Sequence, residues 1–302
     1  MECAAYRRRL RALCGRLRAD PYLNSGEFVR EAALAAAGLP AALSRALSGF
    51  RLHGNPDGFL LLRGMPVAED QGAEACLALI GSRLGEMIGY LQEKDGALFH
   101  DVLPERSQEC EQSAAGSRTA LALHTERCFH PHLPSHVLLA CLRPDPGGEA
   151  RTEIASVQRM LPLLPAGRLP TLFQPVFRTG IDYSFGNIRT EKANGPVMSV
   201  LYGDRGDPNL RYDLDLMVGL TPQARAALEA VRLAAGRVCT MLRLHAGDLL
   251  IIDNRRAVHG RTAFTARYDG RDRWLKRSYL VGDLAASAAD RQPGERVIRT
   301  RF

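Results

Sequence analysis

The sequence lacks the features that define several classes of protein. It has no apolar run of about 18 residues, so it predicts no transmembrane helix. Its first residues, Met-Glu-Cys-Ala-Ala-Tyr-Arg-Arg-Arg, lack the apolar stretch and small-residue cleavage site of a signal peptide. The 7 cysteines are odd in number and form no Cys-x-x-Cys pair, which argues against a disulfide framework. We therefore expect a cytoplasmic protein that does not bind membranes.

A nucleic-acid-binding signature is also missing, although the net charge is +7 and the pI is about 9.2. The arginines are spread along the chain rather than gathered in a basic stripe interleaved with aromatic residues. No zinc-finger, homeodomain or RNA-recognition motif is present. The charge is therefore expected to lie on a solvated surface, and the partner to be a small molecule rather than nucleic acid. The oligomeric state is left open.

What remains is an ordinary globular composition. The chain has 302 residues, of which 46% are hydrophobic and 24% charged, enough for one large domain or two small ones. Residues 1–50 are rich in Ala, Leu and Arg, with leucines at helical spacing, and predict a helical N-terminal layer. Ser25 is expected to cap a helix over residues 27–37, and residues 72–88 predict another helix.

The second half predicts many short strands. Extended runs alternate with Gly, Asn and Pro turns from about residue 175, interrupted by one helix that begins at Thr221-Pro222 and ends near Gly236. Residues 239–244 and 249–253 are expected to form a hairpin, and residues 273–281 a final strand. This pattern indicates an α+β, mainly β fold: a sandwich or jelly roll with helices outside and a ligand site at its open mouth.

Metal-binding residue types occur in the stretch His124-Thr125-Glu126. If residues 122–126 form a strand, the imidazole and the carboxylate two positions apart point into the same space. A third ligand is expected at His259, just beyond the end of the 249–253 strand. Two histidines and one carboxylate on one face suit non-haem Fe(II), with open positions for substrates. The alternative is an ordinary strand with a hydrogen-bonded histidine and an exposed glutamate.

Two arginines in the last predicted strand suggest a second element of the site. Arg273, Leu275 and Arg277 share one face of that strand. Inward-facing guanidiniums need carboxylates, which they hold in charge-assisted pairs. The alternative is a surface strand with solvated arginines, because Trp274 occupies the other face. The polar loop over residues 104–119, directly before the site strand, is predicted to be a lid.

These motifs together resemble those of a known family. The motifs are His-Thr-Glu-x-x-Phe-His-Pro, Leu-x-x-Cys-Leu-Arg-x-Asp and Val-His-Gly-Arg-x-x-Phe-x-x-Arg-Tyr-Asp-Gly-x-Asp-Arg-Trp-Leu. They are similar to those of clavaminate synthase and related arginine and asparagine hydroxylases, which are Fe(II)/2-oxoglutarate-dependent oxygenases. The resemblance implies a double-stranded β-helix (jelly-roll) core over residues 58–283. It implies a single catalytic domain over residues 1–302, and it weakens in residues 1–50.

The resemblance also implies roles for individual residues. The implied iron ligands are His124, Glu126 and His259; the implied contacts to 2-oxoglutarate are Arg273 and Thr152; and the implied substrate contacts are Arg277, Ser113 and Glu93. Fe(II), 2-oxoglutarate and O2 would be the cofactors and co-substrates of an enzyme that hydroxylates a free amino acid in antibiotic-type biosynthesis. Related halogenases carry a small residue in place of the ligating carboxylate, so Glu126 favours hydroxylation.

Asp213 and Asp215 are the residues expected to bind the substrate side chain. A similar Asp-x-Asp grips the guanidinium in the arginine hydroxylases that the chain resembles, which implies hydroxylation of L-arginine or a close analogue at C3 or C4. Two carboxylates match a forked cation. Alternatively, either aspartate lies on the surface or pairs with Arg211 or Arg189. Citrulline, asparagine, lysine or a carrier-bound residue stay open as substrates, as do desaturation, cyclisation and a non-enzymatic binding protein with a vestigial metal site.

Overall fold

The computed structural model describes residues 1–67, 72–181, 185 and 192–300. Its α-helices are α1 (Arg7–Cys14), α2 (Ser25–Ala35), α3 (Ala41–His53), α4 (Gly72–Gly81), α5 (Val157–Met160), α6 (Leu169–Leu172) and α7 (Pro222–Val238). Short 3-10 turns are η1 (Ala4–Tyr6), η2 (Ala36–Gly38), η3 (Lys94–Gly96), η4 (Arg106–Gln108), η5 (Leu161–Leu163), η6 (Ala166–Arg168) and η7 (Ala285–Asp290).

A large sheet runs in the order β1-β13-β5-β15-β2-β16, and β3 pairs with β15. Its strands are β1 (Phe59–Leu62), β2 (Glu86–Tyr90), β3 (His100–Val102), β5 (His136–Arg143), β13 (Leu249–Asp253), β15 (Trp274–Val281) and β16 (Val297–Ile298). Every pairing is antiparallel except that of β16 with β2.

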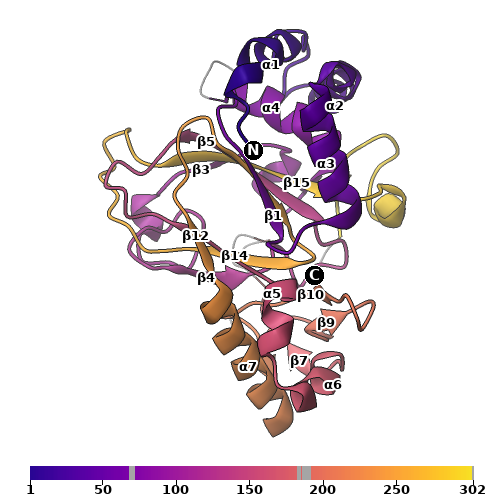
Figure 1. Cartoon of the computed structure of the whole chain (residues 1–302), viewed down its shortest axis with the longest axis vertical. Helices are drawn as coiled ribbons and strands as arrows, with labels where there is room; N and C mark the ends of the chain where they lie inside the picture. The colour runs from indigo at the N-terminus through magenta and orange to yellow at the C-terminus, as the bar shows by residue number, and fades with distance from the viewer. Residues whose placement is uncertain (68–71, 182–184, 186–191, 301–302) are drawn as a thin grey trace.

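A smaller sheet runs in the order β12-β6-β14-β4. Its strands are β4 (Leu121–His124), β6 (Thr152–Ser156), β12 (Thr240–Leu242) and β14 (Ala257–Arg261). Two minor sheets lie beside it and consist of β7 (Phe177–Arg178), β8 (Val197–Met198) and β11 (Val218–Gly219), and of β9 (Leu201–Tyr202) and β10 (Asn209–Leu210). The large and small sheets form the jelly roll of an α+β, mainly β fold, as the sequence predicts (Figure 1).

Side-chain alternation along the strands assigns each face of the large sheet to a different core. In β13, Leu250 and Ile252 join the cluster between the two sheets, which also holds Ile154 of β6. Leu249 and Ile251 point the other way, into the cluster formed with helices α1–α4. Both faces of this sheet are therefore buried, which explains the uninterrupted apolar run of β13.

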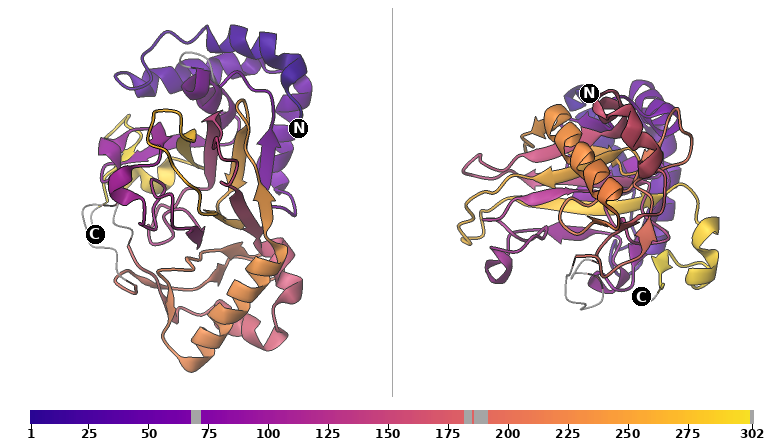
Figure 2. Two further views of the ribbon diagram at one scale, coloured as in Figure 1. Left: turned by 90° about the vertical axis from the view of Figure 1, so that its left-hand side faces the viewer. Right: turned by 90° about the horizontal axis from the view of Figure 1, so that it is seen from below.

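A third cluster covers the outer face of the small sheet. Helix α7 packs Ala227 and Val231 against Ala155 and Val258 of the sheet. Its start is fixed as the sequence predicts: Thr221 Oγ1 accepts a hydrogen bond from Ala224 N at 3.1 Å, and Pro222 is the first helical residue. Figure 2 shows helices α1–α4 at one end of the molecule and α7 at the other, with the sheets between them.

Three local predictions are wrong. Residues 72–88 do not form one helix, because α4 ends at Gly81 and strand β2 begins at Glu86. The helix expected from residue 27 begins at Ser25, and its N-cap is Asn24. The segments around 239–244 and 249–253 form no hairpin: β12 pairs with β6 and β13 with β1 and β5, so the turn between them crosses from one sheet to the other.

Among the described residues, no single helix is long and apolar enough to cross a membrane. Residues 25–53 meet the length and composition criteria only as a pair of helices, Ser25–Gly38 and Ala41–His53, bent by 118°.

Candidate active site

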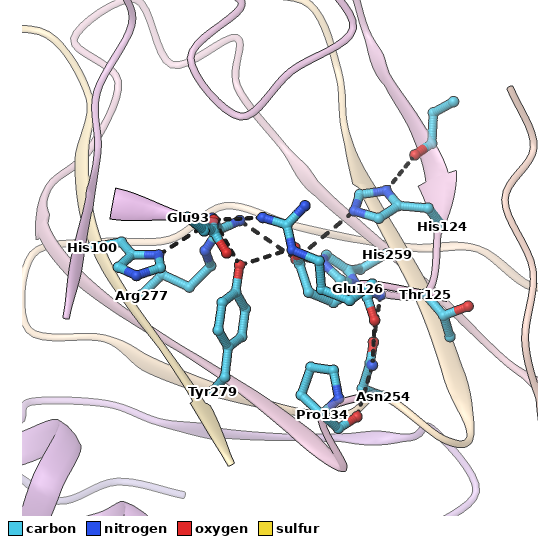
Figure 3. Close-up of polar contacts among 12 residues, drawn as sticks. Glu93, His100, His124, Thr125, Glu126, Pro134, Asn254, His259, Arg277 and Tyr279 are labelled. Atoms are coloured by element: carbon cyan, nitrogen blue, oxygen red, sulfur yellow. Dashed lines mark hydrogen bonds and ion pairs between the residues drawn. The ribbon is translucent and has the colours of Figure 1, made fainter. Parts of the chain in front are cut away.

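Three metal-ligating side chains converge at the mouth of the jelly roll. Donor atoms of His124, Glu126 and His259 all lie within 4.8 Å of one another. Glu126 Oε2 is 3.5 Å from His259 Nε2 and 3.9 Å from His124 Nε2 (Figure 3). The sequence prediction that these three residues meet is therefore matched by the geometry.

The two histidines face each other across one antiparallel ladder. His124, the last residue of β4, is in register with His259 of β14, and their ring centroids are 4.6 Å apart. His124 Nδ1 lies 2.8 Å from the carbonyl oxygen of Ala122. Because a carbonyl can only accept, Nδ1 carries the proton and Nε2 keeps its lone pair for a metal.

Two details of the predicted geometry are wrong. His259 does not lie beyond a strand end but in the middle of β14, which the sequence pattern did not separate from the preceding turn. Glu126 does not share the strand of His124, because β4 ends at His124. Its backbone N–H instead donates to Asn254 Oδ1 at 2.7 Å.

Asn254 anchors the segment that carries Glu126. It is fully buried, and its Nδ2 donates to the carbonyl oxygens of Glu126 at 3.0 Å and Pro134 at 2.9 Å. On the other side, Thr125 Oγ1 accepts from Tyr212 N at 2.8 Å and donates to Tyr212 O at 3.0 Å. The residue before Glu126 and the peptide of Glu126 itself are thus both fixed by hydrogen bonds that do not involve its carboxylate.

A cluster of buried charges lies beside the triad. Oε1 of Glu93 is 2.5 Å from Arg127 Nη2 and 2.6 Å from Arg277 Nη2. Burial raises the pKa of Glu93, but the two guanidiniums outweigh it and hold that pKa well below its usual range. The pKa of Glu126 is likewise held low against burial, first by Arg277. Both carboxylates are therefore ionised.

Unlike Arg127 and Arg277, the buried Arg273 forms no ion pair among the described residues. It is 9% exposed and burial lowers its pKa, yet among the described residues no carboxylate lies within ion-pairing distance of it. Thr152, also buried, faces the same cavity from β6. On the opposite face of β15, Trp274 Nε1 donates to Asp101 Oδ1 at 2.7 Å.

One cavity of about 330 Å³ connects these groups. Its walls include the triad residues, Arg273, Thr152, Arg277 and Glu93, and part of the 104–119 loop. Ser113 of that loop lines the cavity, but its hydroxyl donates to Gln108 Oε1 at 2.9 Å and accepts from Gly116 N at 3.0 Å. Its visible role is therefore to shape the loop.

The two aspartates proposed for the substrate side chain are not among the residues that line this cavity. Asp213 forms an isolated bridge with His124, and its Oδ1 accepts hydrogen bonds from Asp215 N at 2.9 Å and Leu216 N at 2.8 Å. Burial raises the pKa of Asp213, and His124 opposes that rise. Asp215 is 3.4 Å from Lys192 Nζ. Neither pairs with Arg211 among the described residues, and Arg189 lies outside them.

The residues fit an iron ion and a 2-oxo acid. The triad offers two neutral imidazole nitrogens and one carboxylate, the set preferred by non-haem Fe(II). The buried guanidinium of Arg273, which pairs with no carboxylate in the described part of the chain, matches the distal carboxylate of 2-oxoglutarate.

A family model described as taurine catabolism dioxygenase TauD, TfdA family, matches residues 40–279. The chain belongs to this family.

Several curated and solved members of this dioxygenase family are similar over most of their length. L-asparagine oxygenase of Streptomyces coelicolor is 41% identical over 89% of this chain and 84% of its own. Clavaminate synthase 2 of Streptomyces clavuligerus is 37% identical over 94% of this chain and 92% of its own. The solved structure of an asparagine oxygenase with Fe(II), 3-hydroxyasparagine and succinate superposes with a TM-score of 0.89 at 38% identity, covering 97% of this chain and 95% of that one.

The chain is thus an Fe(II)/2-oxoglutarate-dependent dioxygenase of the clavaminate synthase-like group, with Fe(II) as its cofactor and 2-oxoglutarate and O2 as its co-substrates. Three residues of this dioxygenase's site were not anticipated from sequence: Arg127, Asn254 and Tyr279. Tyr279 follows Arg277 by two positions on the same face of β15, so extending the alternation that selected Arg273 and Arg277 would have found it. Nothing in the sequence pattern marks Asn254.

Proposed function

We propose that this dioxygenase hydroxylates free L-arginine or a close analogue at C3 or C4, with Fe(II) held by His124, Glu126 and His259. The observation that supports this most strongly is the presence of two guanidiniums, Arg273 and Arg277, on the wall of the cavity that also holds the triad. One matches the distal carboxylate of 2-oxoglutarate, and the other matches the carboxylate of an amino acid.

His124, Glu126 and His259 would hold the iron, which with 2-oxoglutarate and O2 would supply the chemistry that oxidises a substrate C–H bond to C–OH, with succinate and CO2 as by-products. The side chains of the protein supply position. Arg273 and the Thr152 hydroxyl would hold 2-oxoglutarate, while Arg277 would hold the substrate carboxylate. Glu93 Oε2 is buried without a hydrogen-bond partner among the described residues and faces the cavity, where it suits a substrate ammonium. Ser113 would shape the loop that excludes water.

The side-chain preference rests on Asp213 and Asp215. Oδ2 of Asp213 accepts no hydrogen bond among the described residues, so it is available to a cationic or amide side chain beside His124. The Asp215 carboxylate is half-buried and lies beside the ammonium group of Lys192. A substrate guanidinium would have to compete with Lys192 for this carboxylate. A relative from Catenulispora acidiphila named L-ornithine/L-arginine 3-hydroxylase is 32% identical over 92% of this chain, which supports a cationic substrate.

Asparagine is the second candidate substrate. The observation in its favour is the 41% identity to L-asparagine oxygenase. One aspartate can accept a hydrogen bond from an amide as well as from a guanidinium, so Asp213 alone does not separate the two.

The deciding experiment measures succinate release across a panel of free L-amino acids, with Fe(II), 2-oxoglutarate and ascorbate, and determines the mass of each product. Arginine or citrulline should give stoichiometric succinate and a product heavier by one oxygen. Asp213→Asn should then raise KM for arginine by about 10–100-fold, since one charge-assisted hydrogen bond contributes roughly 1.5–3 kcal/mol.

Other outcomes of that panel would change the proposal. Coupled turnover with asparagine alone replaces the substrate. A product lighter by two hydrogens replaces hydroxylation with desaturation. Succinate release without any amino-acid product points to a carrier-bound residue, and iron binding without turnover points to a vestigial site.

We also propose that residues 1–302 form one catalytic domain, in which helices α1–α4 share a core with the large sheet. A reducing cytoplasm is proposed as its location, which the absence of a disulfide among the described residues supports.

A further inference from the structure

The two oxygens of the Glu126 carboxylate have different surroundings. Oε2 faces the imidazoles, 3.5 Å from His259 Nε2 and 3.9 Å from His124 Nε2, and it also accepts a long hydrogen bond from Arg277 Nη1 at 3.4 Å. Oε1 turns away from them and accepts a hydrogen bond from the Tyr279 hydroxyl at 3.0 Å (Figure 3). Only Oε2 is therefore directed at the position where an ion would contact both histidines.

The hydroxyl of Tyr279 has one proton and two carboxylates within reach. Glu93 Oε1 lies 3.2 Å from it, and Glu126 Oε1 lies 3.0 Å from it. Glu93 Oε1 already receives Arg127 at 2.5 Å and Arg277 at 2.6 Å. Because the needs of Glu93 Oε1 are met by these two cations, the phenolic proton goes to Glu126.

The tyrosine ring is itself held rigidly. Tyr279 is 1% exposed, and its ring centroid is 5.8 Å from that of Tyr90 and 5.5 Å from that of His100, both edge to face. The Arg277 guanidinium lies 5.0 Å from the ring centroid. The phenol therefore has little freedom to follow Glu126 if that carboxylate rotates.

We propose that Tyr279 is a positioning residue that keeps Glu126 a one-oxygen ligand, by holding Oε1 and leaving Oε2 for the ion. A carboxylate that chelated through both oxygens would occupy an additional coordination position, one that the 2-oxo acid or O2 needs. The inference rests on the proposed metal triad and adds to it the residue that fixes how the carboxylate binds.

The test is the affinity for Fe(II) alone, measured anaerobically by titration of the wild type, Tyr279→Phe and Tyr90→Phe. Tyr90 is the matched control, because it is a fully buried neighbouring tyrosine whose hydroxyl donates to the His132 carbonyl oxygen at 2.7 Å instead. We expect Tyr279→Phe to bind Fe(II) about 10–100-fold more weakly, and Tyr90→Phe to bind it as the wild type does.

A second readout examines the coordination itself. With Co(II) in place of iron, Tyr279→Phe should have a visible absorption spectrum different from the wild type, and Tyr90→Phe should keep the wild-type spectrum. Wild-type Fe(II) affinity and an unchanged Co(II) spectrum in Tyr279→Phe would overturn the assignment of Tyr279. Failure of the wild type to bind Fe(II) would instead overturn the triad.

If Tyr279→Phe does not fold, a measurement on the wild type alone tests the role of Tyr279. Zn(II) binding should perturb the near-ultraviolet absorption of a tyrosine, because the Tyr279 phenol is hydrogen-bonded to a ligand of the ion. A difference spectrum without a tyrosine band, at saturating Zn(II), would contradict the proposal.

Discussion

At the scale of single residues, the two cavity arginines are expected to divide the carboxylates between them. Arg273→Lys should raise KM for 2-oxoglutarate by about 10–100-fold, because an ammonium cannot reproduce a two-pronged guanidinium pair. KM for the amino acid should change little. Initial rates at varied concentrations of each substrate measure both constants.

The matched variant is Arg277→Lys, in β15, whose side chain lines the same cavity as that of Arg273. It should show the reverse pattern, a higher KM for the amino acid with little effect on 2-oxoglutarate. If both variants raise the same KM, the assignment of the two arginines is incorrect.

Removal of one triad imidazole should abolish turnover while the fold survives. His259→Ala leaves the backbone pairing of β14 with β4 and β6 intact, and the side chain borders the cavity rather than a packed core. We expect loss of Fe(II) binding and of succinate release, with a circular dichroism spectrum like that of the wild type. Substantial residual turnover would exclude His259 as a ligand.

Sequence reasoning succeeded for residues whose chemistry and spacing coincide. His124 and Glu126 are two positions apart, and Arg273 and Arg277 are four, so residue type and closeness in sequence group each pair, although Glu126 lies beyond the end of β4 and Arg273 just before β15. It failed for Arg127, whose backbone adopts a φ of +53°. A left-handed turn directly after Glu126 redirects that arginine toward Glu93, and no periodic pattern contains such a turn.

At the scale of elements, the close approach of β14 to β4 depends on Gly260. A Cβ at this position would lie 2.5 Å from the Leu121 carbonyl oxygen, a backbone atom that cannot rotate away. Gly260→Ala should therefore push β4 outward and separate His124 from His259. We expect Fe(II) affinity to fall by at least about tenfold, measured by anaerobic titration.

The control is Gly236→Ala in helix α7, where an added Cβ meets no atom within 4 Å. It should leave Fe(II) affinity unchanged and raise stability slightly, by about 0.5–1 kcal/mol. Equal Fe(II) affinity in the Gly260 variant and the wild type would show that the strand spacing is not critical.

Element types were easier to predict than element partners. The strand at residues 249–253 and helix α7 follow from apolar runs and capping residues. The partner of each strand does not, because an apolar run buried on both faces carries no signal of which strand lies beside it. For this reason the turn between β12 and β13 was expected to close a hairpin, whereas it connects two sheets.

At the scale of the whole molecule, buried histidines are expected to shape the pH dependence of stability. Burial lowers the pKa of His136 from 6.5 to about 4. Between these pH values the unfolded chain binds a proton that the folded chain does not, so the free energy of unfolding falls as the pH falls. The loss amounts to about 3 kcal/mol at most.

Urea unfolding of the wild type and His136→Gln at several pH values between 7 and about 4 checks this expectation. The variant should have a flatter dependence than the wild type. His53→Gln, at an exposed position, should follow the wild type. Parallel curves for all three proteins would exclude His136 as the source.

The indole of Trp274 gives the molecule a built-in optical probe. The sequence contains a single tryptophan. Trp274 follows Arg273 directly, and its indole N–H donates a hydrogen bond to Asp101, a residue of the cavity wall. When a dicarboxylate is added under argon, the emission of this indole should change in intensity or wavelength. Co-substrate affinity then becomes measurable by fluorescence without label, turnover or oxygen.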